Sequence, residues 1–133
     1  DSGARRGALG RTVEKGRVAR FQLPTMSNFT HYRDHVGSNP DKFFKSALFQ
    51  SQRLMLGLNC LEPGQAQHAH THESQDKFYF VVEGEGEFVV GGEKHTAGEG
   101  AVVWAPAGVD HGVTNNGTKR LTLLVGIAPA PGK

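Results

Sequence analysis

The sequence predicts an all-β protein, a single-domain jelly-roll barrel of antiparallel strands. Three observations lead to this fold class. Short apolar or alternating runs recur about every 8–12 residues, with turn-forming residues between them. Glycine is abundant, at 18 of 133 residues, as tight turns require. No helical segment longer than about two turns is apparent that would cover a sheet face. The sheets must therefore cover each other, and a jelly roll is the simplest way to do so.

The N-terminal segment and the barrel are expected to be distinct. Residues 1–16, rich in Gly and Arg, are expected to form an irregular arm, and residues 17–133 the barrel domain. A strand is expected at 17–23, stopped by Pro24, followed by a loop with a helical turn at 25–40. From residue 43 onward the pattern is that of β-structure. The strands predicted there are 43–50, 52–61, 67–72, 78–82, 87–90, 94–96, 101–105, 111–114 and 121–127.

Turn residues mark the ends of these strands. Pro63 and Gly64 follow the second strand, and the Gly91-Gly92 pair joins two short strands as a hairpin. The last two strands are connected through Asn116 and Gly117, which also favour a turn. The alternation is thus interrupted where a jelly roll needs its corners.

Charge and composition limit the possible partners. The formal net charge of +2 provides no electrostatic argument for nucleic-acid binding. The charge is uneven: residues 1–60 carry ten basic and four acidic side chains, and residues 61–133 carry five and nine. The basic arm is interpreted as a solvated tail or as a segment that docks on a second copy of the chain. We expect neither nucleic acid nor a membrane as a partner.

One cysteine and no long apolar run characterise the rest of the chain. Cys60 is the only cysteine, so an intrachain disulfide is excluded, and its apolar surroundings favour a buried thiol. No apolar run approaches the length that spans a membrane, and no signal peptide is visible. A cytoplasmic location is therefore expected.

Histidines are concentrated on one predicted strand. His68, His70 and His72 alternate along it, so that their side chains point to the same side of a regular strand. His111 follows the turn at Pro106 and Gly108, which returns the chain to the same mouth of the barrel. Imidazole is the commonest metal-binding side chain. Three such nitrogens suit a divalent transition metal, namely Zn, Fe, Ni, Cu or Mn, with positions left for water or substrate.

Two segments, 64–84 and 100–115, resemble the paired motifs of the cupin family. Their matching residues are Gly64, His70, His72 and Gly84 in the first motif, and Gly100, Pro106, Gly108, His111 and Asn115 in the second. The resemblance implies a small jelly-roll barrel with His70, His72 and His111 as metal ligands. It also implies a glutamate ligand seven residues before Gly84, where this chain has Lys77.

Three interpretations of this departure remain open. A bulge could turn Asp76 inward as the carboxylate ligand, with Lys77 outward. Alternatively, His68 could join the other three histidines, since it shares their alternation. In the third interpretation the site holds a weakly bound metal or none, and Lys77 pairs with a carboxylate. An inward ammonium beside a divalent cation would lose its proton or turn away.

Two classes of function follow from these residues. The first is a metal-dependent enzyme, similar to a dioxygenase or an isomerase, that acts on a small molecule. Lys77 would then be a general base of lowered pKa, and the Tyr79 hydroxyl would orient the substrate. The second is a non-catalytic barrel that binds or senses a small molecule. In either case we expect a homodimer, because cupin-like barrels often pair.

Other aromatic and histidine side chains have simpler interpretations. We expect the aromatic run at 78–80 to be core or dimer interface, and Trp104 to pack rather than bind a ligand. The remaining histidines are expected to be solvated: His31, His35 and His95.

Overall fold

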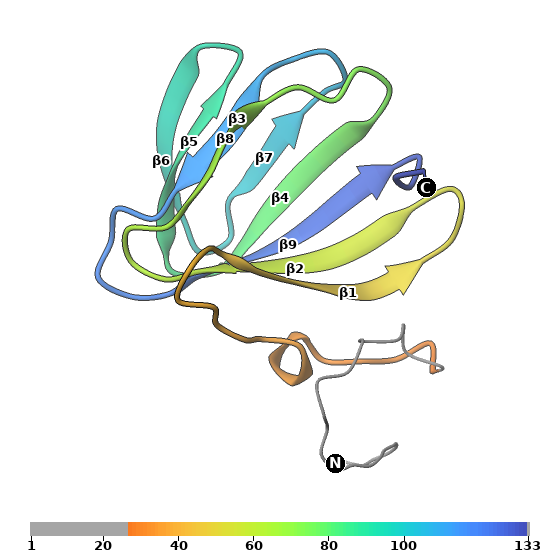
Figure 1. Cartoon of the computed structure of the whole chain (residues 1–133), viewed down its shortest axis with the longest axis horizontal. Coiled ribbons are helices and arrows are strands. Elements are labelled where there is room, and N and C mark those ends of the chain that lie inside the picture. The colour runs from red at the N-terminus through yellow and green to blue at the C-terminus, as the bar shows by residue number, and fades with distance from the viewer. Residues whose placement is uncertain (1–26, 133) are drawn as a thin grey trace.

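Two antiparallel sheets pack face to face in the computed structural model, which describes residues 27–132 (Figure 1). The predicted arm at 1–16 and the predicted strand at 17–23 lie outside the described residues. The all-β jelly-roll barrel predicted from the sequence is confirmed. A short 3₁₀ helix, η1 (Tyr32–Asp34), precedes the first strand of the described part.

The nine strands are divided between the two sheets. The five-stranded sheet has the order β1-β2-β9-β4-β7, and the four-stranded sheet has the order β3-β8-β5-β6. Their bounds are β1 (Phe44–Gln50), β2 (Met55–Leu61), β3 (Ala66–His70), β4 (Asp76–Glu83), β5 (Glu85–Val90), β6 (Glu93–Gly98), β7 (Val102–Ala105), β8 (His111–Thr114) and β9 (Leu121–Ala128).

The hairpin predicted at the glycine pair is present between β5 and β6. Gly91 and Gly92 have φ values of 58° and 86°, a left-handed conformation that side chains with a Cβ rarely adopt. Val90 pairs with Glu93 immediately on either side of them. The turn therefore sets the register of this edge of the smaller sheet.

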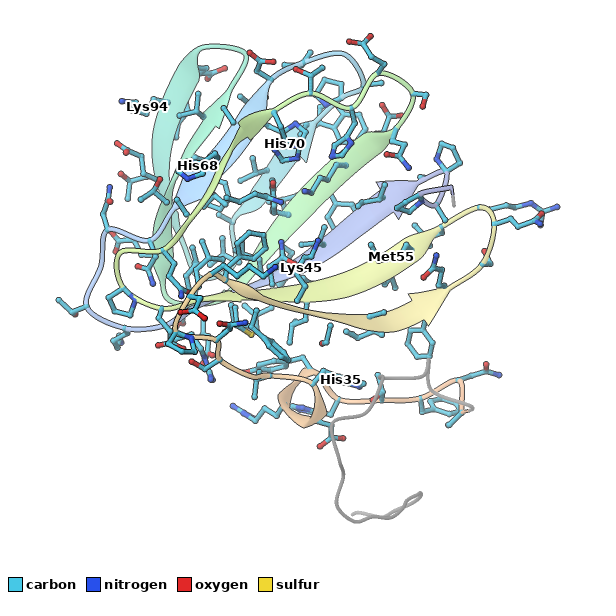
Figure 2. All side chains as sticks on the ribbon, viewed as in Figure 1. His35, Lys45, Met55, His68, His70 and Lys94 are labelled. Atoms are coloured by element: carbon cyan, nitrogen blue, oxygen red, sulfur yellow. The ribbon has the colours of Figure 1, made fainter. Side chains whose placement is uncertain are left out.

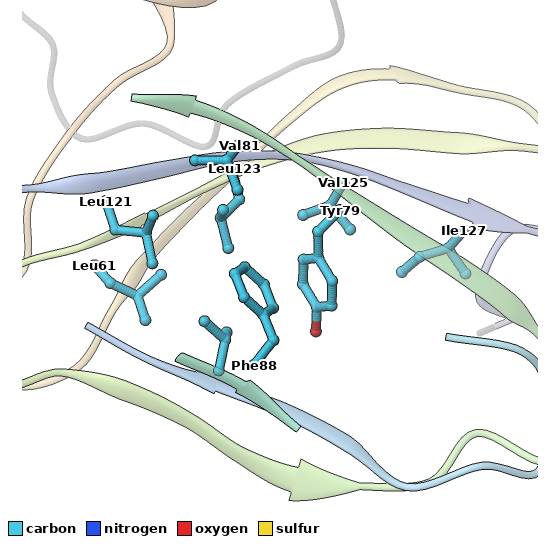
Figure 3. Packing of buried hydrophobic residues seen from close by; sticks show 9 residues of the cluster. Leu61, Tyr79, Val81, Phe88, Leu121, Leu123, Val125 and Ile127 are labelled. Carbon is cyan, nitrogen blue, oxygen red and sulfur yellow. The ribbon is translucent and has the colours of Figure 1, made fainter. Parts of the chain in front are cut away.

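The inward faces of the two sheets form the main core (Figure 3). The rings of Tyr79 on β4 and Phe88 on β5 lie between the sheets, with centroids 5.4 Å apart. Leucine, valine and isoleucine side chains surround them: Leu61, Val81, Val113, Leu121, Leu123, Val125 and Ile127. Burying such side chains contributes roughly 1.5–3 kcal/mol each, so this cluster is the principal source of the barrel's stability.

A second cluster covers part of the outer face of the larger sheet. Tyr32 and Val36, from the segment before β1, pack on Leu48, Leu58 and Cys60. Cys60 is fully buried, and burial raises the pKa of its thiol. The buried thiol expected from the sequence is thus present.

Two of the simpler expectations were wrong. His35 is not solvated: its Nδ1 is buried, its Nε2 lies 2.7 Å from the Thr30 hydroxyl, and burial lowers its pKa. Trp104 does not pack into the interior, because its side chain is on the outer face of β7 and is 56% exposed. Both errors arise because the burial of a side chain depends on other segments of the folded chain, which the residues around it in the sequence do not reveal.

Several strands end or begin at one mouth of the barrel. In the larger sheet Lys77, at the start of β4, pairs with Ile127 and Ala105, near the ends of β9 and β7. In the smaller sheet His70, which ends β3, pairs with His111, which begins β8. This mouth therefore collects the chemically informative residues of both motifs.

Candidate metal-binding site

Three histidines converge at this mouth. His70 ends β3, His72 follows it in the next loop, and His111 begins β8. One nitrogen from each ring can be chosen so that all three lie within 4.8 Å of one another. The Nε2 atoms of His70 and His72 are 3.0 Å apart. Two motifs that are distant in sequence thus form one cluster, as expected.

The backbone orients two of these rings for metal binding. The Nδ1 atom of His70 lies 2.8 Å from the carbonyl oxygen of His68, and that of His111 lies 3.1 Å from the carbonyl oxygen of Val109. A ring that donates from Nδ1 to a carbonyl keeps the lone pair of Nε2 available. The backbone therefore directs both Nε2 atoms as ligands.

The environment favours the neutral form of two of these imidazoles, those of His72 and His111. Burial lowers the pKa of His72, and its electrostatic interactions with His70 and Lys77 act in the same direction. Burial likewise lowers the pKa of His111, although its hydrogen bond to Val109 acts in the opposite direction. Neutral rings are the form that binds metals.

The donor set fits a divalent transition metal. The Nε2 atom of His111 is buried and has no hydrogen-bond partner among the described residues. An unpartnered buried polar atom is costly unless a ligand satisfies it. Three imidazoles with positions left open are also the usual donor set of catalytic zinc and related ions.

A bulge in β3 decides which residues of that strand face the interior. Gln67 pairs with Val113 and His70 pairs with His111, so the register shifts between them. Opposite the shift, a Cβ on Gly112 would lie 2.9 Å from the carbonyl oxygen of Gln67 and 2.8 Å from the Ala69 nitrogen. The two strands approach this closely because residue 112 has no side chain.

The bulge separates His68 from the other histidines. Gln67 reaches the hydroxyl of the buried Tyr79 and His70 joins the ligand cluster, whereas His68 is exposed. Figure 2 labels His68 and His70 on this strand. The expectation that His68 joins the cluster assumed unbroken alternation along the strand. The described ligand cluster contains His70, His72 and His111 but not His68.

Lys77, rather than Asp76, points into the barrel. Strand β4 pairs regularly with β7 from Lys77 to Phe80, so no bulge occurs at this point. Lys77 is only 3% exposed, whereas Asp76 is exposed and accepts a 2.9 Å hydrogen bond from the Ala107 nitrogen. The expected inward turn of Asp76 is not found, because the bulge lies in β3.

The Lys77 ammonium has few partners. Its Nζ lies 3.5 Å from Oε1 of Gln67 and 4.8 Å from the centroid of the Tyr79 ring. Burial, with a smaller contribution from the charge of Lys45, lowers the pKa of Lys77 to about 8. Over residues 27–132 Lys77 forms no ion pair with a carboxylate, contrary to the third interpretation.

Gln67 is a site residue that we did not predict. Tyr79 donates a 2.5 Å hydrogen bond from its hydroxyl to Oε1 of Gln67, the same atom that Lys77 approaches. Burial raises the pKa of Tyr79, so its hydroxyl remains protonated. Gly112 was the available signal, since an isolated glycine within a strand indicates a bulge.

A separate hollow lies at the open edge between β6 and β7. It has a volume of about 670 Å³, and its lining includes His95, Glu99 and Trp104 but none of the three clustered histidines. The histidine cluster is the stronger candidate site, because convergent ligand atoms indicate chemistry more directly than the volume of a hollow does.

The chain is a small barrel of two antiparallel sheets with a candidate three-histidine metal site at its mouth. Comparison with known proteins identifies the family. The cupin domain model matches residues 57–127, and the chain belongs to the cupin family. The solved structure of TT1209 from Thermus thermophilus is 40% identical, with a TM-score of 0.76. That match covers 79% of this chain and 100% of the Thermus chain.

Two further similarities are more limited. A Klebsiella pneumoniae protein with a double-stranded β-helix domain has a TM-score of 0.75 over 80% of this chain and 94% of its own. At 21% identity, this match supports the fold alone. An uncharacterized protein of Streptomyces coelicolor is 37% identical over 62 residues, which are 47% of this chain and 58% of that protein. The chain thus matches less than two thirds of that relative.

No helix among residues 27–132 is long and apolar enough to cross a membrane.

Proposed function

We propose that the protein is a small metal-dependent enzyme that acts on a small molecule at the barrel mouth, with dioxygenase- or isomerase-like chemistry. The observation that carries this proposal is the histidine cluster, whose ligand atoms lie within 4.8 Å of one another. The buried, unpartnered Nε2 of His111 supports it further. His70, His72 and His111 would hold the metal.

The metal would polarise a carbonyl group or activate water or O₂. The chain's own contribution is a proton at Lys77 Nζ. A pKa of about 8 allows this group to exchange a proton near neutral pH. Tyr79 acts as a positioning residue, because its hydroxyl holds the amide of Gln67 beside the ammonium.

A metal titration tests the site. We expect the protein to bind Zn²⁺ or Mn²⁺ at one site per chain in calorimetry, and His111→Ala to weaken the affinity at least ~100-fold. His68→Ala is the matched control, since it removes an exposed imidazole of the same strand and should leave the affinity unchanged. Equal affinity of the native protein and His111→Ala would show that the histidine cluster is not the metal site.

A non-catalytic binding or sensing barrel is the second candidate. Lys77 favours it, because an ammonium stands where the family motif has a metal-binding carboxylate. Elemental analysis of the purified protein separates the two candidates. A stoichiometric redox-active metal supports the enzyme, and a metal-free barrel that retains an organic molecule supports the binder.

If the protein is an enzyme, Lys77→Met is expected to change both the rate and the pH profile of its reaction. An unaltered pH profile would exclude Lys77 as the acid–base group.

A further inference from the structure

The mouth of the barrel carries uncompensated positive charge. Lys77 is 3% exposed and faces the interior from β4. The exposed Lys45 lies farther along the larger sheet, in register with Asn59, and its charge has only a smaller effect on Lys77. Three neutral imidazoles would add no negative charge to a divalent metal. The metal and the Lys77 ammonium would therefore both be positive, with no ligand carboxylate to offset them.

The acidic residues near this mouth are engaged elsewhere or point outward. Asp76 is exposed and accepts the hydrogen bond from Ala107. Asp110 accepts a hydrogen bond from the Thr71 hydroxyl, and both residues are exposed. Glu73, in the loop after His72, is also exposed. None of these carboxylates forms an ion pair with Lys77 in the described part of the chain.

The ammonium group of Lys77 also has N–H donors without a hydrogen-bond acceptor among the described residues. An ammonium group has three N–H bonds, and the hydrogen bond that Nζ forms within residues 27–132 is to Oε1 of Gln67 at 3.5 Å, which is long. That oxygen already accepts the much shorter bond from Tyr79. A desolvated cation with unused donors is stabilised by an anion.

We propose that the barrel mouth binds a small carboxylate, held between Lys77 Nζ and the three-histidine site. This inference rests on the proposed function, since it names the class of ligand for the same site. The carboxylate would accept a charge-assisted hydrogen bond from Lys77 and supply the negative charge that the replaced glutamate would have supplied. A neutral molecule of the same shape would leave the ammonium unpaired and bind more weakly.

Calorimetry with acetate, malonate and citrate tests this inference, with acetamide and malonamide as neutral counterparts. The titrations are run on metal-loaded and on metal-free protein. We expect at least one carboxylate to bind at least ~10-fold more tightly than its amide, and Lys77→Met to remove that preference. Lys94→Met is the control, because it removes an exposed lysine of β6 and should change the affinity by less than about twofold.

The outcomes separate this inference from the metal site. Metal binding without any preference for carboxylates over amides would overturn the carboxylate proposal and leave the metal site standing. A carboxylate preference in metal-free protein that disappears in Lys77→Met would support it even if no metal binds. Equal carboxylate affinity in the native protein, Lys77→Met and Lys77→Gln would overturn it, provided that circular dichroism shows both variants folded.

Discussion

At the scale of single residues, Lys77 is the most informative side chain in this barrel. A lysine is rarely buried to this degree, because removing its ammonium group from water costs several kcal/mol. The nearby Gln67 amide and Tyr79 ring offset only part of that cost. Lys77 thus reduces the stability of the folded protein, but its ammonium group is available to bind a ligand.

The free energy of unfolding should show this cost through its pH dependence. Because the pKa of Lys77 is about 8 in the folded protein against an ordinary value of 10.5, the unfolded chain binds more protons between these pH values. Its contribution therefore makes stability rise with pH across this window. Below pH 8 the penalty is fully present, at up to about 3 kcal/mol.

Lys77→Met is expected to remove that penalty. In urea denaturation without added carboxylate, we expect the variant to be more stable than the native protein at pH 7, by about 1–3 kcal/mol. The difference should diminish by pH 10, where the native amine is largely neutral. An equal difference in stability at both pH values would contradict a buried Lys77 with a lowered pKa.

At the scale of secondary-structure elements, the bulge of β3 arranges the site. It places Gln67 and His70 on the inward face and leaves His68 outside. Gly112 on β8 permits it, since a Cβ there would meet backbone atoms of β3 at 2.8–3.0 Å. Backbone atoms cannot rotate away as a flexible side chain can, so the clash can be relieved only if the strands move.

Gly112→Ala is therefore expected to disturb both stability and metal binding. We expect a loss of about 1–3 kcal/mol in urea denaturation, because the two strands must move apart. Metal affinity should fall as well, because His70 and His111 pair beside this contact. In the matched control Gly98→Ala, the nearest atom to the new methyl group would be 3.8 Å away. Indistinguishable behaviour of the two variants would argue against the bulge.

At the scale of the whole molecule, the outer face of the larger sheet is covered unevenly. The segment before β1 covers β1 and β2, as shown by the contacts of Tyr32 and Val36. Over β4 and β7, in contrast, large apolar side chains remain exposed among the described residues: Phe80 at 36%, Val102 at 69% and Trp104 at 56%. A contiguous apolar patch of this kind is typical of an interface.

We expect the protein to be a homodimer, with a light-scattering mass about twice 14.4 kDa at micromolar concentration. Trp104→Lys should shift the mass toward the monomer if this face forms the interface. Thr118→Lys, in the loop between β8 and β9, is the control for the added charge, because Thr118 is exposed and lies outside this patch, and it should leave the mass unchanged. A native mass near 14.4 kDa would refute the homodimer.

Most of the strands could be predicted, because alternation and turns are local properties. The hairpin at Gly91-Gly92 and the strands before and after it occur within a few residues of the predicted positions. The inward direction of His68 was wrongly expected for a specific reason. Alternation holds only while the register is unbroken, and one extra residue in a strand reverses the faces beyond it.

Motif spacing and chain-local patterns were thus sufficient for the barrel, for the family resemblance and for the approach of His70, His72 and His111. Three features were evident only from the tertiary structure: the inward direction of Lys77, the exclusion of His68 from the histidine cluster, and the position of Gln67 beside the Lys77 ammonium. Each depends on how β3 pairs with β8 or β4 with β7 and β9. Such pairings join distant segments, so the surroundings of a side chain are set by residues that its own neighbourhood in the sequence does not contain.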